Sequence, residues 1–242
     1  MRARHRHFNP AHAGATLALD ARYIAQANAS SVSSWASRPR GSFTMGQATA
    51  ANRPTLQLTA MNGAAAVRFD GSNNWLACSR IATTSNFTSL VVVSGVGQQN
   101  KVVFLQRAYS ANIGRTLFCV TSEATPFQKG RLFFNNGASF SAISTTDAFN
   151  NNATLFCSES DGSGNSHVRV KNGAKEGTLT GQSWTPENAD ALLGAIADSG
   201  IAPLNAFSGD IGAVSFFPAQ CSDALRCRAH HAAAFSFKIS CN

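Results

Sequence analysis

The ten residues VRFDGSNNWL, from Val67 to Leu76, contain a strand, a tight turn and the start of a return strand. In the first four of them, alternate side chains point to opposite faces of a sheet. The middle of the stretch holds Gly71 and Asn73, two residue types that tolerate a positive φ. Trp75 then begins the second extended segment. A strand, a turn rich in glycine and asparagine, and another short strand together predict an all-β fold.

The same pattern continues along the chain, because short runs rich in Val, Ile, Leu, Phe or Thr recur between turn residues. Asn-Gly pairs at 136–137 and 172–173 indicate hairpins, since both central residues of a type I′ turn need a positive φ. These features predict a two-sheet antiparallel jelly-roll sandwich. The predicted strands cover residues 15–19, 55–58, 65–69, 74–78, 87–96, 101–107, 116–121, 131–134, 154–159, 167–171, 191–197 and 207–217.

The composition agrees with one β domain of 242 residues. Charged residues make up 13% of the chain, about half the usual quarter, while glycine, asparagine, serine and threonine supply the polar surface. This balance disfavours long solvent-facing helices, which need Glu and Lys. The chain has no run of about 18 apolar residues, so no membrane span is predicted. The apolar residues 15–19 are too few for the core of a secretory signal peptide.

A basic arm begins the chain. The formal net charge is +8, and Arg2, Arg4 and Arg6 all lie within the first seven residues. We predict that residues 1–12 form an arm outside the sandwich, where a solvated terminus, a protein contact and a nucleic-acid contact are all open roles. If the arm has a partner, we expect the three arginines to dock another protein, and nucleic acid is the least favoured ligand.

A helix and a last strand are predicted at the C-terminus. The helix covers residues 222–234, and Ser222 can cap the free N–H groups of its first turn. After it, Phe235 and Phe237 alternate with polar residues at the period of a strand, which we predict over residues 235–240. Such an added strand can extend the sheet of a neighbour, so we expect these two phenylalanines to dock a partner.

Four segments share a pattern with a known family. They are LALDA and VSSW at 17–21 and 32–35, QATAANRPTL at 47–56, NG and VRFDGSNNWL at 62–63 and 67–76, and GDIGAV and SDALR at 209–214 and 222–226. In this order they resemble the laminin-G-like, concanavalin-A-like jelly roll that is common in bacterial and bacteriophage surface proteins. The resemblance implies that residues 13–242 form one concanavalin A-like sandwich that includes the C-terminal helix and strand.

One departure from the family pattern bears on metal binding. The chain has Asn74 where the family often has aspartate, and in pentraxin-like relatives acidic groups near this turn help to hold calcium. Loss of a carboxylate weakens such a site, because Ca²⁺ prefers several charged oxygens. The resemblance therefore leaves calcium open without indicating it, and we expect no cofactor.

The chain lacks the residue patterns of common catalytic and metal sites. Glycan hydrolases need two carboxylates that face one sugar, whereas the 12 carboxylates of this chain are dispersed. There is no G-x-S-x-G elbow for a serine nucleophile, and no cysteine pair has the C-x-x-C spacing of a zinc site. We expect the cysteines to be reduced, with a bridge from Cys241 to Cys221 or Cys227 as the alternative. We therefore predict that the protein is not an enzyme and has no metal site.

Flat aromatic rings are the remaining candidates for ligand contacts. Phenylalanine is core material, whereas tryptophan and tyrosine rings stack on sugars and keep a polar tip in water. The candidates are Trp35, Trp75, Trp184, Tyr23 and Tyr109. The two tryptophans at 35 and 75 match family positions that look structural. We predict Trp184, in a loop, and Tyr109 as carbohydrate-binding residues.

Two functional hypotheses follow, and both are non-enzymatic. The first is a structural or adhesive protein of a bacteriophage virion, such as a head decoration, head fibre or tail fibre module. Its expected partners are capsid or tail proteins, further copies of itself and a host surface glycan, and its expected location is the virion surface. The alternative is a carbohydrate-binding, lectin-like module that is secreted or displayed at a cell surface. A glycan-cleaving enzyme is the least favoured hypothesis.

Overall fold

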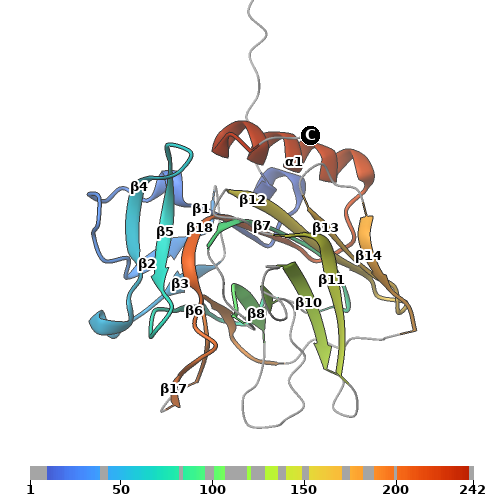
Figure 1. The fold of residues 1–242 in the computed structure, drawn as a ribbon, viewed down its shortest axis with the longest axis horizontal. Coiled ribbons are helices and arrows are strands. Elements are labelled where there is room, and N and C mark those ends of the chain that lie inside the picture. The colour runs from blue at the N-terminus through green and yellow to red at the C-terminus, as the bar shows by residue number, and fades with distance from the viewer. Residues whose placement is uncertain are drawn as a thin grey trace, which may run out of the picture.

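The computed structural model describes residues 10–38, 43–81, 84–95, 101–106, 119–120, 129–135, 140–148, 153–170, 175–181, 188–198 and 201–239. Its larger sheet has eight antiparallel strands in the order β14-β13-β12-β7-β18-β5-β4, with β1 paired to β18 (Figure 1). These strands are β1 (Leu17–Asp20), β4 (Thr55–Met61), β5 (Ala64–Asp70), β7 (Asn86–Ser94), β12 (Thr154–Asp161), β13 (Ser166–Val170), β14 (Lys175–Leu179) and β18 (Ser208–Phe217).

The remaining strands form smaller sheets. A five-stranded sheet has the order β2-β3-β6-β15-β8, a three-stranded sheet the order β11-β10-β9, and β16 pairs with β17. These strands are β2 (Ser34–Ala36), β3 (Thr44–Gly46), β6 (Leu76–Cys78), β8 (Phe104–Gln106), β9 (Cys119–Val120), β10 (Lys129–Asn135), β11 (Phe140–Ala148), β15 (Ala191–Leu193), β16 (Ile196–Asp198) and β17 (Ile201–Leu204). The 3-10 helices are η1 (Pro10–Ala13), η2 (Ala21–Tyr23) and η3 (Ala50–Asn52), and the α-helix is α1 (Asp223–Phe237).

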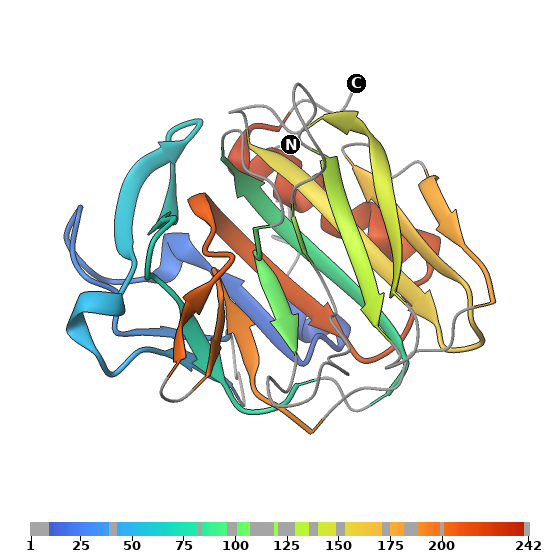
Figure 2. The ribbon, with the colours of Figure 1, turned by 60° about the horizontal axis from the view of Figure 1, so that its bottom comes forward.

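The larger sheet is covered on both faces. Figure 2 shows the smaller strands in front of it and α1 behind it. One apolar cluster lies on the inner face, where the rings of Phe87 and Phe216 stack with centroids 5.8 Å apart. A second cluster, which includes Leu90 and Leu155, lies on the outer face beneath α1. Every residue of β7 after Asn86 is buried, as expected for a strand with packing on both sides.

The predicted turn after β5 is present, but it joins two sheets. The Oδ1 atom of Asp70 accepts the N–H groups of Ser72 and Asn73 at 2.8 and 3.1 Å, so the carboxylate holds the turn. Gly71 has a φ of +79°, and a Cβ atom there would lie 2.6 Å from the Cβ atom of Ser208. The strand that follows, β6, pairs with β15 and β3 rather than with β5. The turn therefore carries the chain from the larger sheet to the five-stranded sheet.

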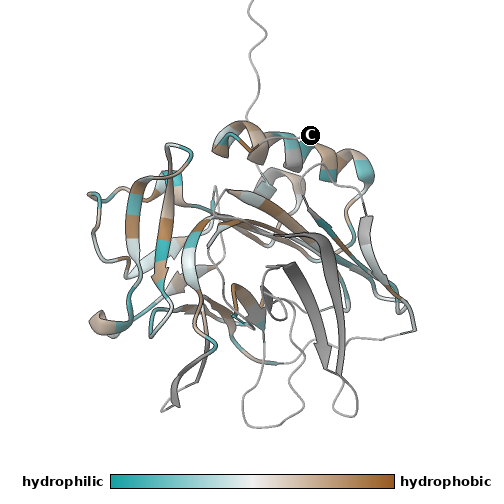
Figure 3. Ribbon diagram, in the orientation of Figure 1, coloured by the Kyte–Doolittle hydropathy of each residue, from teal (hydrophilic) through white to brown (hydrophobic). Residues whose placement is uncertain are grey.

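The C-terminal helix is confirmed and is longer than predicted. The Oγ atom of Ser222 accepts the N–H of Leu225 at 3.3 Å, which is the predicted cap. The helix continues to Phe237, and Lys238 then adopts a left-handed conformation. Figure 3 shows polar and apolar segments alternating along α1. None of the helices among the described residues has the length and apolar character needed to cross a bilayer.

The predicted last strand over residues 235–240 is wrong, because Phe235 and Phe237 belong to the helix. Residues two apart on a helix point in nearly opposite directions, whereas on a strand they share a face. Phe235 is accordingly 73% exposed, while Phe237 is 1% exposed. The side chain of Asn62, in the β4–β5 turn, donates to the carbonyl oxygens of Phe237 at 2.9 Å and Lys238 at 3.2 Å. This distant cap stabilises a helical end that local periodicity did not predict.

A buried ion-pair network joins α1 to the sheet. Glu159 on β12 is fully buried, and its carboxylate accepts from Arg169 on β13 at 2.6 and 3.0 Å. Its second oxygen accepts from Arg226 on α1 at 3.0 Å. Arg226 also pairs with Asp223 in the first turn of the helix. The network therefore links two strands to the helix through a single carboxylate.

The cysteines differ sharply in exposure, which gives a first prediction. Cys78, Cys157 and Cys221 are buried, Cys227 is exposed, and all four are free. Cys241, the other end of the alternative bridge, lies outside the described residues. Burial raises the pKa of Cys78 to about 12, and it also raises the pKa values of Cys157 and Cys221. The reactive species is the thiolate, so iodoacetamide at pH 8 should modify Cys227 before these three buried thiols.

Peptide mapping by mass spectrometry after timed labelling measures this order. The three buried thiols should react only after unfolding in denaturant, which serves as the control for their accessibility. Native labelling of Cys157 at the rate of Cys227 would contradict the packing of α1 on the sheet.

Candidate ligand-binding site

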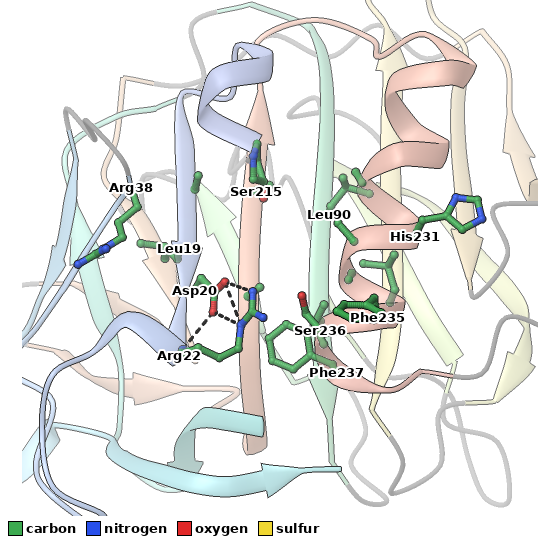
Figure 4. A pocket seen from close by; sticks show the side chains of 18 of the residues that line it. Leu19, Asp20, Arg22, Arg38, Leu90, Ser215, His231, Phe235, Ser236 and Phe237 are labelled. Atoms are coloured by element: carbon green, nitrogen blue, oxygen red, sulfur yellow. Dashed lines mark hydrogen bonds and ion pairs between the residues drawn. The ribbon is translucent and has the colours of Figure 1, made fainter. Parts of the chain in front are cut away.

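A cavity of about 850 Å³ lies between α1 and the outer face of the larger sheet (Figure 4). Its floor consists of small and apolar side chains from β1, β7, β12 and β18. Ala18 on β1 pairs with Ser215 on β18, and Ala213 lies beside them on the same face. These small side chains leave open the space between the helix and β1, where larger residues would fill it.

One wall is built on the first turn after β1. The Asp20 side chain accepts the backbone N–H of Arg22 at 3.0 Å and so caps η2. The same carboxylate pairs with the Arg22 guanidinium through contacts of 2.9 Å and 2.5 Å, drawn in Figure 4. The hydrogen bond to Asp20 raises the pKa of Arg22, so this cation is held in place and stays charged. Its guanidinium carbon lies 5.3 Å from the centroid of the Phe237 ring, which links this wall to α1.

The segment after β2 adds a second arginine to this wall. Ser37 accepts the N–H of Ala18 at 2.8 Å, and the N–H of Arg38 donates to the carbonyl of Ala18, also at 2.8 Å. These bonds hold Arg38 against the edge of β1. Its guanidinium carbon lies 4.6 Å from the centroid of the Tyr23 ring, a cation–π distance. Tyr23 is 50% exposed, so half of its surface is open to a ligand.

The opposite wall is one face of α1. Arg228, His231 and Phe235 occupy positions i, i+3 and i+7, which bring them onto one side of a helix. The Nδ1–H of His231 donates to the carbonyl of Cys227 at 2.8 Å, which leaves Nε2 available as an acceptor when the ring is neutral. These three residues lie on the exposed side of α1, at the rim of the cavity, and Figure 4 shows the His231 ring pointing away from it.

This arrangement suits binding better than hydrolysis. Among the described residues that line the cavity, Asp20 is the one carboxylate, and its ion pair with Arg22 occupies it. A glycosidase needs a second, opposed carboxyl group. Apolar walls with a few convergent polar groups are instead the usual composition of a ligand pocket.

The structure brings together some of the residues predicted from sequence. Phe235 and Phe237 both line the cavity, from opposite sides of the helix, and Tyr23 was among the ring candidates. Trp35 is 1% exposed in the core, as predicted from its family position. The predicted sugar-binding residues Trp184 and Tyr109, and the arm residues Arg2, Arg4 and Arg6, lie outside the described residues.

Sequence reasoning missed the four basic residues of the cavity. Arg22, Arg38 and Arg228 are isolated in the sequence, and their convergence depends on how β1, β2 and α1 pack. Two local features of the sequence could have pointed to some of these basic residues. The stretch DARY, residues 20–23, places a carboxylate two positions before an arginine. The helical spacing of residues 228, 231 and 235 marks one face of the C-terminal helix.

The fold is a lectin-like jelly-roll sandwich with one short C-terminal helix, and solved structures of the same class resemble it. No family model matches the sequence, and none of the curated proteins matches it. Domain 4 of the extracellular arabinanase AbnA from Geobacillus stearothermophilus, solved with arabinotriose, is 12% identical with a TM-score of 0.60. That match covers 88% of this chain and 97% of the domain.

Two further solved structures show the same fold in other settings. A Trypanosoma rangeli sialidase in complex with 2,3-difluorosialic acid is 12% identical with a TM-score of 0.62. The match covers 93% of this chain and 33% of the sialidase, so this chain spans about a third of the length of that enzyme. The heptameric pentraxin of Limulus polyphemus is 16% identical with a TM-score of 0.51, over 72% of this chain and 81% of its own. At these identities the similarity shows the fold alone.

Proposed function

We propose that this protein is a non-catalytic carbohydrate-binding module and that the cavity beside α1 is its sugar site. The observation that carries the proposal is the half-exposed ring of Tyr23, held by the capped turn at Asp20 in a cavity with further polar and aromatic groups. Tyrosine rings present a flat apolar face and a polar tip, which suits the face of a pyranose. A cavity of this volume is large enough for a short oligosaccharide.

The similar solved structures support this class of function. The arabinanase domain, which matches nearly the whole of this chain, was solved with arabinotriose bound. The pentraxin has the same sandwich, and the sialidase match covers only about a third of that enzyme. These similarities favour the carbohydrate-binding alternative over our first hypothesis.

The role in a bacteriophage virion stays a prediction. The solved structures named above give it no support, and the arm at residues 1–12 lies largely outside the described residues. The expected capsid or tail partners, self-association, a location on a virion or cell surface and the expected lack of a cofactor stay predictions too. A virion component that binds a host glycan would use the same cavity, so the proposed site serves either setting.

Replacement of Tyr23 by alanine tests the proposed site. Loss of the ring removes the stacking surface, and we expect glycan affinity to fall about tenfold, which corresponds to about 1.4 kcal/mol. A glycan array identifies the ligands of the unmodified protein, and calorimetry on the best of them measures the change.

The control is Tyr23→Phe, which keeps the ring and should keep most of the affinity. Circular dichroism and thermal melting confirm that both variants fold, as expected for a half-exposed side chain. If the array shows no glycan that binds, or if Tyr23→Ala binds as well as the unmodified protein, the proposed site is wrong.

A further inference from the structure

We infer that the ligand is an anionic oligosaccharide whose charged groups are carboxylates, an inference that rests on the proposed function. The cavity between α1 and β1 is lined by three arginines and a histidine, against one aspartate, among the described residues. A neutral sugar needs few fixed charges, whereas this excess of positive charge attracts an acidic one.

The three arginines differ in how much of their binding capacity is already used. Arg22 forms a two-point ion pair with Asp20 inside the cavity. Arg38 and Arg228 are both exposed, and neither forms an ion pair with a carboxylate among the described residues. These two guanidinium groups therefore have free donors, and they come from the two opposite walls.

Arg38 is also oriented for a ligand. Its backbone bond to β1 and its contact with the Tyr23 ring restrict where the guanidinium lies. A guanidinium offers parallel N–H donors that match the two oxygens of a carboxylate. A uronic acid whose ring contacts the exposed part of Tyr23 would bring its carboxylate within reach of this group. On the helix side, Arg228 can pair with a carboxylate of another residue of the same oligosaccharide.

The shape of the cavity favours a sugar over an arbitrary polyanion. Its floor is formed by apolar and small side chains, among them Leu90, Val92 and Ala213, and its walls carry Tyr23 and Phe235. A highly charged chain with no flat face gains nothing from these surfaces. An acidic oligosaccharide matches both the arginines and the apolar surfaces of the cavity, because it carries charges along its length and apolar faces on its rings.

A matched pair of ligands tests the inference. Short oligomers of galacturonate, glucuronate and mannuronate are compared with their methyl esters, which keep the sugar ring and remove the charge. At about 50 mM salt we expect the best acid to bind at least tenfold more tightly than its ester. Raising the salt to about 300 mM should remove most of the difference in affinity between the acid and its ester, since exposed charges are screened.

Variants locate the effect. Arg38→Gln and Arg228→Gln should each weaken binding of the acid about fivefold and weaken binding of the ester much less. Both residues are exposed, so neither substitution should lower stability. Arg80→Gln is the control, because it removes the same charge from the segment after β6, outside the cavity. It should leave affinity for the acid unchanged.

The outcomes separate the inference from the proposed function. Equal affinity for acid and ester, lost in Tyr23→Ala, would overturn the inference and leave carbohydrate binding intact. Binding of polyglutamate as tight as that of the best uronate oligomer would show a general polyanion attraction and overturn it as well. If no member of the panel binds in either form, the inference is wrong, while neutral glycans on the array still test the function.

Discussion

Replacement of Glu159 by glutamine is expected to lower the free energy of unfolding by about 3–5 kcal/mol. Glu159 is fully buried and receives hydrogen bonds from both Arg169 and Arg226. Glutamine has nearly the same shape, but it removes the buried negative charge that Arg169 and Arg226 share, and Arg226 keeps only its pair with the exposed Asp223. Urea unfolding followed by tryptophan fluorescence measures the change. In hydrogen exchange, the backbone amides at the end of the sheet under α1 should lose their protection first.

A multiple variant distinguishes the loss of charge pairing from the loss of packing. Replacing Glu159, Arg169 and Arg226 together by apolar residues of similar volume removes the buried charges, and the Asp223 carboxylate that loses its partner is exposed to solvent. Such replacements are often neutral or stabilising, so this variant should be far more stable than Glu159→Gln. Equal destabilisation of the two would show that the helix depends on the shape of these side chains and not on their charges.

Replacement of Phe237 by alanine is expected to lower the free energy of unfolding by about 3–5 kcal/mol. Its ring is 1% exposed, fits against Gly212, and contacts the Arg22 guanidinium at 5.3 Å. Removal of the ring leaves a void beneath the last turn of α1 and releases the wall that carries Arg22. We therefore expect weaker ligand binding as well as lower stability, measured by urea unfolding and by calorimetry.

Phe235→Ala is the matched comparison, since it removes the same side chain two positions away. Phe235 is 73% exposed, so its loss should change stability by less than about 0.5 kcal/mol. Equal effects of the two substitutions would favour the strand that we predicted for residues 235–240 over the helix.

Local sequence patterns predicted the strands with long apolar runs well. The run from Phe87 to Val93 lies between the two apolar clusters, where any strand of that composition would be buried. They predicted less well the short strands β2, β3 and β14, which contain few apolar residues and depend on neighbours for their hydrogen bonds. Pairing partners are remote in sequence, so no local window contains the information that selects them.

The candidate site likewise combines local features that the sequence shows with contacts between remote segments that it does not show. Tyr23 and the spacing of residues 228, 231 and 235 were visible in the sequence, but the cavity exists because three separate segments pack around small residues on β1 and β18. A lone arginine in a sequence has no assigned surroundings. Arg38 becomes part of a site only through its backbone bond to Ala18, twenty residues earlier in the chain.

The fold class, the turn at Asp70 and the cap at Ser222 could be predicted from the sequence, because strand alternation, the turn and the cap each depend on residues within about four positions of one another. Tertiary structure alone decided that β6 joins the opposite sheet, that α1 continues to Phe237, and that three arginines meet at one cavity. Asn62 caps the end of that helix from 175 positions away, a separation over which periodicity and residue propensity carry no signal. Contacts of this kind form only when the sheets pack, and the proposed binding site is made of them.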